Sequence, residues 1–327
     1  MAYTDIDNPS ETAFNTKIYT GNGTTDTSIT GVGFQPDMSW FKGRTNTENH
    51  FLFDSIRGAT VRLIPNGTST DLTAAQSMKS FDSDGFTLGS DADVNQNSIN
   101  FVSWNWKAGG GAGSSNEDGS INTTSTSVNQ TAGFSISTWT GTGSNATVGH
   151  GLGAVPKMII TKARSNTYDW YTYHASIGNT KNVYINLTNA ESGASTSFHN
   201  NTNPTSSVWT AGGGVYNVDY TFVTYAFAEK QGYSKIGSYV GTGVDSGAFS
   251  FCGFKPSFVL TKRTDSAGSW VIQDNKRPGY NETSLDLNPN NSEAEEGNNG
   301  IDMCANGFKQ RNTDAHTNAS GGNYIFY

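Results

Sequence analysis

Residues 19–42 read YTGNGTTDTSITGVGFQPDMSWFK, and the same pattern returns without a gap at residues 139–162 and 239–262. Each copy starts with an aromatic residue, has glycines two, four and fourteen places later, and continues with a proline and a short apolar run. That run ends in a lysine at the same offset in every copy: Lys42, Lys162 and Lys262. Because the copies start 120 and then 100 residues apart, they indicate three related domains in tandem rather than a solenoid of small units.

The segments between the glycine-rich turns have the composition of β-strands. Residues 134–139, 158–162 and 222–227 are short, rich in β-branched and aromatic side chains, and bounded by turn-forming residues. Each copy holds about seven or eight such runs, a density typical of a β-sandwich or jelly roll. The sequence therefore predicts an all-β chain of three tandem β-sandwich, jelly-roll-like domains of roughly 100 residues. Helical propensity gathers at residues 71–79, enough for two turns at most.

The repeated glycines are interpreted as scaffold. Glycine allows the positive φ that a turn after a strand needs, and proline suits the start of the next strand. A phosphate-binding loop is disfavoured, because no helix follows the glycines.

The segments between the repeated motifs indicate the domain boundaries. Residues 108–116, AGGGAGSSN, have the composition of a flexible tether, and residues 123–130 are expected to form an extra strand or extended arm. Only residues 229–232 separate the second copy from the third, so we expect these two to form the closer pair, with the first copy freer. The predicted units are an N-terminal arm (1–13), repeat 1 (14–108), a Gly/Ser-rich linker and extended arm (109–130), repeat 2 (131–229) and repeat 3 (230–327).

Composition excludes several classes of protein. Charged residues make up 15% of the chain, the net charge is −8, and the densest basic stretch is Lys262–Arg263, so no nucleic-acid partner is expected. No window approaches eighteen apolar residues, and the first residues lack the basic and apolar regions of a signal peptide. We expect no membrane insertion and no secretion by a signal peptide.

A search for chemistry finds little that is specific. The sequence has no GxSxG elbow, its five histidines are scattered, and its carboxylates fall mainly in loops. The acidic stretch at residues 82–85 is interpreted as a turn beside a strand rather than a calcium loop. We therefore expect that the protein is not an enzyme and that it has no catalytic residues, no metal ligands and no cofactor. Cys252 and Cys304 could pair if neighbouring strands bring them within bonding range.

Two repeated charge pairs are the best candidates for a specific contact. Asp54 ends the aromatic stretch HFLFD of the first copy and Arg57 follows three places later, and Asp274 and Arg277 stand at the same places in the third. The middle copy has His174 and Ile177 there. We expect each pair to fix a loop by a salt bridge or to contact another subunit; the residues of any ligand site stay unassigned.

Four quoted stretches carry a resemblance to a known family. The segments YTGNGTTDTSITGVGFQPDMSWFKGR, HFLFDSIRGAT, SFDSDGFTLGSD and FVSWNWKAGG together resemble a tandem β-repeat domain of virion structural proteins from tailed phages, especially phages of marine bacteria. The segment AGFSISTWTGTGSNATVGHGLGAVPKMIITKAR in the second copy is similar to the same family. The resemblance covers the chain from Phe14 onwards and carries over no catalytic or binding residue.

The resemblance implies a location on the virion surface, after synthesis in the host cytoplasm without a signal peptide. The expected function is that of a non-enzymatic virion structural protein, either a capsid decoration protein or a short fibre or appendage. One alternative is a tail-fibre protein for host attachment that binds a receptor or a carbohydrate, and another is a polysaccharide-degrading enzyme. Expected partners are other virion proteins of capsid or tail, copies of the chain itself and, in the first alternative, host surface glycans.

The last strand of the third copy differs from its counterparts. It stops at Tyr327, whereas the corresponding strands of the first two copies continue past the equivalent aromatic residue. Either the chain is cut there or another subunit completes the final sheet edge. The second possibility predicts an oligomer.

Overall fold

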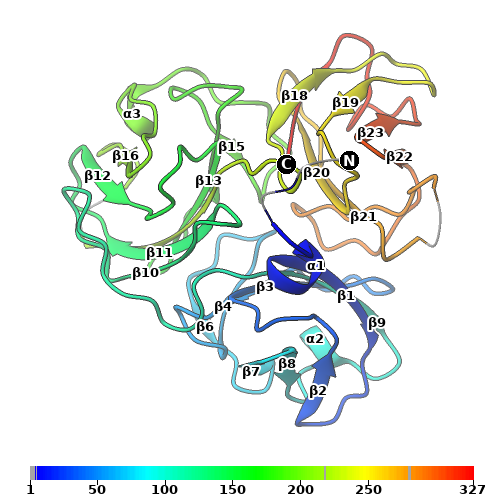
Figure 1. Cartoon of the computed structure of the whole chain (residues 1–327), viewed down its shortest axis with the longest axis horizontal. Coiled ribbons are helices and arrows are strands. Elements are labelled where there is room, and N and C mark those ends of the chain that lie inside the picture. Colours follow the sequence, from blue (N-terminus) through cyan, green and yellow to red (C-terminus); the bar gives the residue numbers. More distant parts are fainter. Residues whose placement is uncertain (1–3, 5, 217–218, 279–280) are drawn as a thin grey trace.

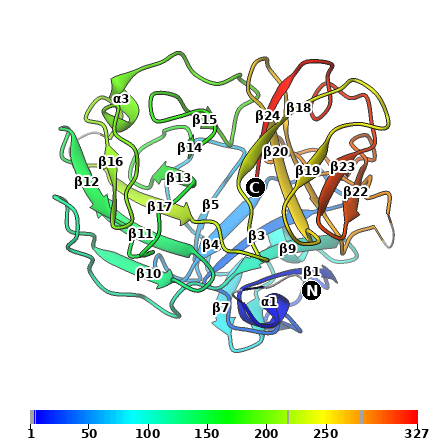
Figure 2. The same ribbon diagram turned by 45° about the horizontal axis from the view of Figure 1, so that its top comes forward.

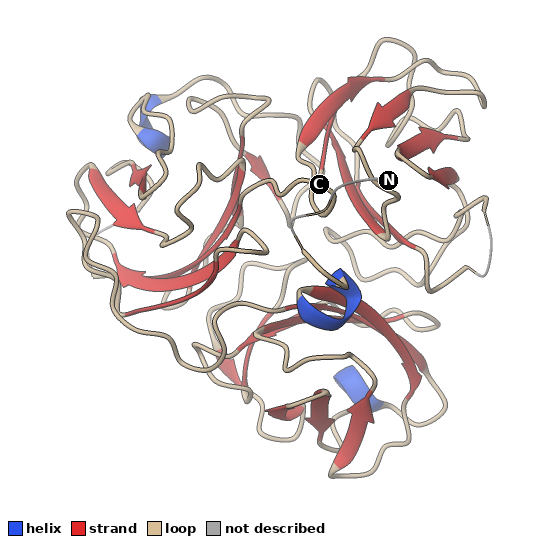
Figure 3. Cartoon of the chain, in the orientation of Figure 1, coloured by secondary structure: helices blue, strands red, loops and turns tan. Residues whose placement is uncertain are grey.

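The computed structural model describes residues 4, 6–216, 219–278 and 281–327. These residues form strands with short helices at α1 (Pro9–Thr12), α2 (Ala92–Asn95) and α3 (Thr196–His199), which confirms the predicted all-β class (Figure 3). None of these helices has the length and hydropathy of a membrane span. The helical tendency expected at residues 71–79 is wrong, because β6 (Leu72–Thr73) and β7 (Met78–Asp82) lie there and Met78 is buried in the core of the first repeat.

The first repeat consists of two antiparallel sheets. The larger sheet has the order β1-β9-β3-β4-β5-β6, so the first and last strands of the repeat lie side by side. The smaller sheet has the order β2-β8-β7. The strands not yet given bounds are β1 (Phe14–Thr20), β2 (Thr27–Thr30), β3 (Met38–Gly43), β4 (Phe51–Asp54), β5 (Val61–Leu63), β8 (Gly85–Leu88) and β9 (Asn100–Trp106).

The second repeat follows the same plan, with β10 added at one edge and, among the described residues, no counterparts of β6 and β7. Its larger sheet is β10-β11-β17-β13-β14-β15, and its smaller sheet is β12-β16. Their bounds are β10 (Ser125–Asn129), β11 (Phe134–Thr140), β12 (Ala146–Gly149), β13 (Met158–Ala163), β14 (Tyr171–His174), β15 (Val183–Tyr184), β16 (Val208–Ala211) and β17 (Thr221–Phe227). The added strand β10 lies on the outer side of β11, within the segment where an extra strand was expected (Figure 2).

The third repeat closes on a strand that is not at a sheet edge. Its larger sheet is β18-β24-β20-β21, and its smaller sheet is β19-β23-β22. Their bounds are β18 (Gly237–Val240), β19 (Phe249–Phe251), β20 (Phe258–Arg263), β21 (Trp270–Asp274), β22 (Ile301–Cys304), β23 (Gly307–Gln310) and β24 (Asn323–Phe326). Since β24 lies between β18 and β20, the expectation that another subunit completes an edge at this strand is wrong.

Strands β3 and β13 of the first two larger sheets are buried on both faces. Side chains alternate between the faces of a strand, and in β3 Met38 and Trp40 contribute to a core shared by all three repeats, whereas Phe41 belongs to the core of its own repeat. The same alternation holds in β13, where Met158 and Ile160 belong to the shared core. Every residue of β3 and β13 is therefore buried, unlike a strand with one solvated face.

The three repeats surround a common centre (Figure 1). One continuous cluster of buried side chains takes members from the larger sheets of all three repeats, including Trp104, Tyr225 and Ile325. Tyr327 touches each repeat: its ring packs on Phe227 and Phe258, and its hydroxyl accepts a hydrogen bond from Trp106 Nε1 at 3.4 Å. The expectation of a freer first repeat is therefore wrong.

The linker after the first repeat is bound rather than free. Asp37 is fully buried, and its carboxylate accepts hydrogen bonds from the backbone N–H groups of Ala108 (2.8 Å), Gly110 (3.1 Å) and Gly111 (3.1 Å). Gly113 has a φ of +69°, and a Cβ there would lie 2.4 Å from the Thr126 carbonyl oxygen, so glycine allows this close approach. The prediction of a flexible tether at 108–116 is wrong because a buried carboxylate and a neighbouring strand hold the glycines.

The N-terminal arm also packs on the molecule where it is described. Ile6 is buried with Ala13, Ala132 and Tyr233. Residues 1–3 and 5 of the expected arm lie outside the described residues.

Candidate functional site: the junctions between the repeats

Both repeated charge pairs form buried salt bridges. Arg57 Nε lies 2.6 Å from Asp54 Oδ2, Arg277 Nε lies 2.6 Å from Asp274 Oδ2, and all four side chains are fully buried. The same aspartates accept the backbone N–H of Arg57 (2.9 Å) and Arg277 (3.1 Å) through Oδ1. Each pair thus closes the loop that follows its strand, β4 or β21.

Each aspartate also joins two repeats of the same chain. Asp54 Oδ2 accepts a hydrogen bond from the Tyr225 hydroxyl of the second repeat at 2.6 Å. Asp274 Oδ2 accepts one from Trp104 Nε1 of the first repeat at 3.0 Å. At the remaining junction His174, which replaces the aspartate in the middle copy, lies with Nε2 3.3 Å from the Phe326 carbonyl oxygen. The three equivalent positions thus link repeats 1 and 2, 2 and 3, and 3 and 1.

Further charges extend this network across two of the junctions. Asp71 Oδ1 lies 3.0 Å from Arg57 and its Oδ2 lies 2.7 Å from Arg164 Nε of the second repeat. Glu295 corresponds to Asp71: it bonds Arg277 at 3.2 Å and accepts two hydrogen bonds, at 2.9 and 2.8 Å, from Arg44 of the first repeat. Paired N–H donors of this kind fix the orientation of a carboxylate as well as its charge.

A backbone hydrogen bond recurs at the same place in all three junctions. Asp71 N donates to Arg164 O at 2.9 Å, Glu191 N to Thr264 O at 2.8 Å, and Glu295 N to Arg44 O at 2.8 Å. At the junction between the second and third repeats a threonine replaces the arginine, and Glu191 pairs with Lys181 of its own repeat instead. The three junctions therefore share this backbone hydrogen bond and differ in the charged side chains around it.

The repeated lysines are buried at these junctions. Each Nζ donates to the carbonyl of the next residue, and Lys162 and Lys262 also donate across a junction to Thr68 O (3.1 Å) and Thr188 O (3.3 Å). Lys42 donates to Gly43 O at 2.8 Å and to Asn46 O at 3.2 Å. Burial lowers the pKa of all three amines from 10.5 to about 8.

Aromatic rings at the start of the fourth strand add another contact between repeats. Trp170 Nε1 donates to Ile64 O and Gly67 O of the first repeat, both at 3.1 Å, and Trp270 Nε1 donates to Tyr184 O of the second at 2.7 Å. His50 occupies this position in the first repeat, and burial and the nearby Lys42 charge hold its pKa well below the usual value. The imidazole is therefore neutral at pH 7.

Burial, charges and hydrogen bonds set the protonation states of the junction residues. Burial alone would raise the pKa of Asp274, but the Arg277 charge and the hydrogen bonds from Trp104 and Arg277 outweigh it and lower that pKa. Burial raises the pKa of Tyr225 well above 10 and lowers that of His174 to about 4. At neutral pH Asp274 is charged, while Tyr225 and His174 are neutral hydrogen-bonding groups.

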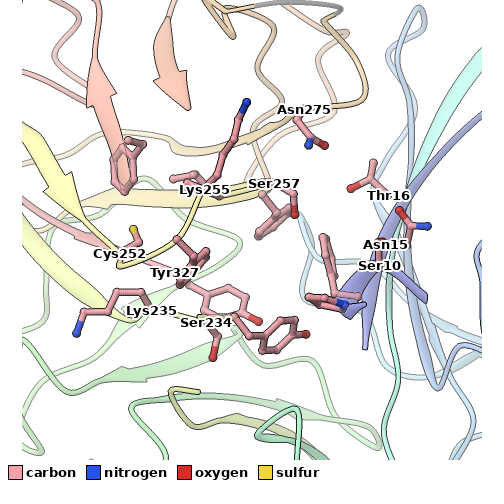
Figure 4. A pocket seen from close by; sticks show the side chains of 18 of the residues that line it. Ser10, Asn15, Thr16, Ser234, Lys235, Cys252, Lys255, Ser257, Asn275 and Tyr327 are labelled. Atoms are coloured by element: carbon pink, nitrogen blue, oxygen red, sulfur yellow. The ribbon is translucent and has the colours of Figure 1, made fainter. Parts of the chain in front are cut away.

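The junction between the third and first repeats holds a cavity of about 340 Å³ (Figure 4). Phe14 and Trp106 of the first repeat and Phe258 and Tyr327 of the third line its apolar side. Its polar lining includes Ser10, Asn15, Thr16, Ser257, Asn275, Lys255 and Lys276. Its volume falls in the range of about 300–1,000 Å³ typical of ligand pockets.

The other residues singled out in the sequence lie in the core or in turns, or are unpaired cysteines. Five tryptophans that could stack on a sugar only if their rings were exposed are buried: Trp40, Trp139, Trp170, Trp209 and Trp270. Cys252 and Cys304 are free. Asp84 accepts hydrogen bonds from Gly31 N (3.0 Å) and Gly33 N (2.6 Å), as a turn residue does. Among the described residues, no group of three or more His, Cys, Asp or Glu side chains is arranged to hold a metal ion.

Sequence reasoning missed four charged residues of the junctions: Arg44, Asp71, Arg164 and Glu295. A signal was present for the arginines, since Arg44 and Arg164 each follow a repeated lysine by two places. The acidic partners lie at different distances along the chain after Arg57 and Arg277. Asp71 follows Arg57 by 14 residues and Glu295 follows Arg277 by 18, so the two acids do not fall at equivalent positions of the repeats.

Comparison with known proteins gives one match. Searches of the curated proteins and of the solved structures find nothing similar to the chain. One family model, described as a domain of unknown function (DUF7483), matches residues 8–327 and so spans all three repeats. The chain belongs to this DUF7483 family.

Proposed function

We propose that the protein is a non-enzymatic structural protein on the outside of a phage particle, either a capsid decoration protein or a short fibre or appendage. The observation that carries the proposal is the ring of contacts between the repeats. The buried groups Asp54, Asp274, Lys162 and Lys262 all bond across a junction. Their chemistry serves to hold three sheets in one fixed arrangement, as a particle component under mechanical load requires.

The quoted sequence motifs support the phage context. They resemble a repeat of virion structural proteins, and they come from the first two of the three repeats that surround the common core. The proposed partners are other virion proteins, at a position on the virion surface.

Locating the chain in particles tests this function. Particles purified by density gradient from a lysate that contains the chain are to be analysed by mass spectrometry and by cryo-electron microscopy. We expect the chain to sediment with intact particles and three-lobed density to lie outside the shell or on the tail. Absence of the chain from gradient-purified particles would refute the proposal.

Two assays on the purified chain separate the other functions. Retention on a glycan array would favour host attachment through carbohydrate, and release of reducing ends from host polysaccharide would favour an enzyme. We expect neither signal.

A further inference from the structure

The smaller sheet of the third repeat ends in an apolar edge strand. β19 stands first in the order β19-β23-β22, so β23 bonds one of its sides and no described strand bonds the other (Figure 1). Phe249 and Phe251 of this strand are 46% and 63% exposed, whereas Ser250 between them is buried. Exposed edge strands with apolar side chains are places where a further strand can pair.

The backbone of β19 presents free hydrogen-bonding groups at this edge. Towards β23, Cys252 N donates to Asn306 O at 2.9 Å. In an antiparallel pair every second residue bonds the neighbouring strand, so Phe249 and Phe251 direct their N–H and C=O groups away from β23. No described residue bonds these outward groups.

In the second repeat the chain itself covers the equivalent edge. β12 corresponds to β19, because each pairs with the strand that carries the core aromatic residue Trp209 or Phe308. On the outer side of β12, Ile121 N donates to Thr147 O at 3.0 Å. The sandwich therefore accepts an extended segment along this edge.

In the first repeat the same edge is polar. β2 corresponds to β19, and its exposed residues Ser28 and Thr30 occupy the places of Phe249 and Phe251. The fold therefore does not require the two phenyl rings. Exposed apolar groups that the fold does not need indicate a contact with another molecule.

The sequence of the edge strand is complementary to itself. Phe249, Ser250 and Phe251 read the same in both directions, so a twofold axis through Ser250 pairs Phe249 of one copy with Phe251 of another. The outward groups of these residues then form about four hydrogen bonds between the copies. The rings meet as cross-strand aromatic pairs on the outer face of the sheet.

The charges that flank the strand are complementary in the same register. Asp245 and Lys255 stand five positions before and after Ser250, and both are exposed. Neither forms an ion pair with a described residue. Antiparallel pairing about Ser250 directs Asp245 of one copy at Lys255 of the other on both sides of the axis, as a contact between identical surfaces requires.

We propose that β19 pairs antiparallel with β19 of a second copy of the chain, so that two smaller sheets join into one continuous sheet across a twofold axis. Phe249 and Phe251 form the centre of the contact, and Asp245 and Lys255 its ends. This edge belongs to a different sheet from β24. The inference goes beyond the proposed function and does not depend on whether the protein belongs to a phage particle.

Sedimentation equilibrium of the full chain tests the association. We expect a reversible monomer–dimer equilibrium between micromolar and millimolar concentration. Phe249→Ser combined with Phe251→Thr installs the residues of the first repeat, so this variant is expected to fold and to dimerise at least about 10-fold more weakly through loss of apolar burial. Val155→Thr, at a 49% exposed valine of the second repeat, is the matched control and should dimerise like the wild type. Melting temperatures verify folding.

Hydrogen exchange measured by NMR locates the contact. Exchange at the amides of Phe249 and Phe251 should slow as the protein concentration rises, because these groups bond the second copy. Exchange at Ser28 and Thr30, on the equivalent edge of the first repeat, should stay constant. Exchange at Phe249 and Phe251 that does not change as dimers form would contradict pairing through β19.

Charge exchange tests the antiparallel register. Asp245→Lys and Lys255→Asp each bring like charges together in their own dimer and are expected to weaken it by about 3- to 10-fold. An equimolar mixture of the two variants restores opposite charges and should dimerise more tightly than either alone. The inference is overturned if the mixture is no tighter, if the double phenylalanine variant dimerises like the wild type, or if the wild-type chain stays monomeric at millimolar concentration, which would leave the edge to a different polypeptide.

Discussion

At the scale of single residues, the two Asp–Arg pairs do more than fix a loop. Each aspartate accepts from an arginine and a backbone N–H of its own repeat and from an aromatic donor of the next repeat. A buried ion pair is stable only when such extra hydrogen bonds offset its desolvation. The middle repeat achieves the same contact with the neutral His174, which is why the fold tolerates the missing pair.

Removing one member of a pair is therefore costly. Asp274→Ala removes the fully buried partner of Arg277 Nε and leaves Glu295 as its remaining ion-pair partner among the described residues, and it is expected to lower the free energy of unfolding by about 3–5 kcal/mol. Asp265→Ala, which removes the surface partner of Arg263, is the matched control, with an expected loss of about 0–1 kcal/mol. Urea denaturation followed by tryptophan fluorescence measures both.

A double variant tests the explanation for the middle repeat. Asp274→His combined with Arg277→Ile installs the pair of residues found there and is expected to be more stable than Asp274→Ala alone. If the double variant is less stable than Asp274→Ala, the contact that His174 makes in the second repeat depends on side chains that the third repeat lacks.

The buried lysines predict an unusual response to alkaline pH. Burial lowers the pKa of Lys42, Lys162 and Lys262 from 10.5 to about 8. Between these two values the unfolded chain binds more protons than the folded chain, so stability rises with pH in this window. Above pH 10 the buried tyrosines act in the opposite direction, because burial raises the pKa of groups such as Tyr225.

Denaturation midpoints from pH 7.5 to 9.5 measure this response. We expect the midpoint to rise across the range for the wild-type chain and to rise less for Lys162→Met, which keeps the length of the side chain without the amine. Lys79→Met, at a partly exposed lysine, should leave the slope unchanged. A flat or falling wild-type curve would show that the amines are solvated in the folded protein.

At the scale of elements, the segment between the first two repeats changes character because of its neighbours. Residues 108–111 are held by Asp37, and β10 adds to the outer side of β11 with five paired residues. Glycine-rich composition describes the freedom of an isolated chain. It does not reveal a buried carboxylate more than 70 residues earlier in the sequence.

Asp37→Ala should release this segment. Three backbone N–H groups lose their shared acceptor, and we expect hydrogen exchange at Gly110 and Gly111 to speed up strongly while β10 stays protected. Asp118→Ala, in an exposed part of the same linker, is the control. Limited proteolysis should cut the first variant within residues 108–116 and leave the second intact; equal protection in both would contradict the role of Asp37.

At the scale of the whole molecule, the shared core makes the repeats depend on one another. The larger sheet of each repeat has one face covered by its own smaller sheet and the other covered by neighbouring repeats. A separated repeat would expose apolar side chains such as Trp170, Tyr225 and Ile160. Burial of that area contributes about 25 cal/mol per Å² of apolar surface.

We therefore expect one cooperative unfolding transition for the full chain and no stable fold for a polypeptide of residues 131–229. Differential scanning calorimetry of the full chain and near-UV circular dichroism of the fragment measure these outcomes. Three separate transitions, or a folded fragment, would show that the local cores suffice.

Much of the fold was predictable from the sequence. The strands are predicted correctly because alternation, β-branched composition and turn glycines act over a few residues: Gly23, Gly143 and Gly243 have φ values of +68°, +69° and +69° at equivalent turns. The helical tendency at 71–79 failed because pairing and burial of Met78 outweigh local propensity. The loop-closing part of the Asp–Arg pairs was also predictable from the sequence, because the partners are only three positions apart.

The sequence by itself determined the all-β class, the threefold repeat and the positions of the turns, since these depend on neighbouring residues and on spacing. Only the tertiary structure decided what the charges bond, that the linker is held, and that a cavity lies between the third and first repeats. The physical reason is distance along the chain: Trp104 and Asp274 are 170 residues apart, and only the arrangement of the sheets around a common core brings them within 3.0 Å.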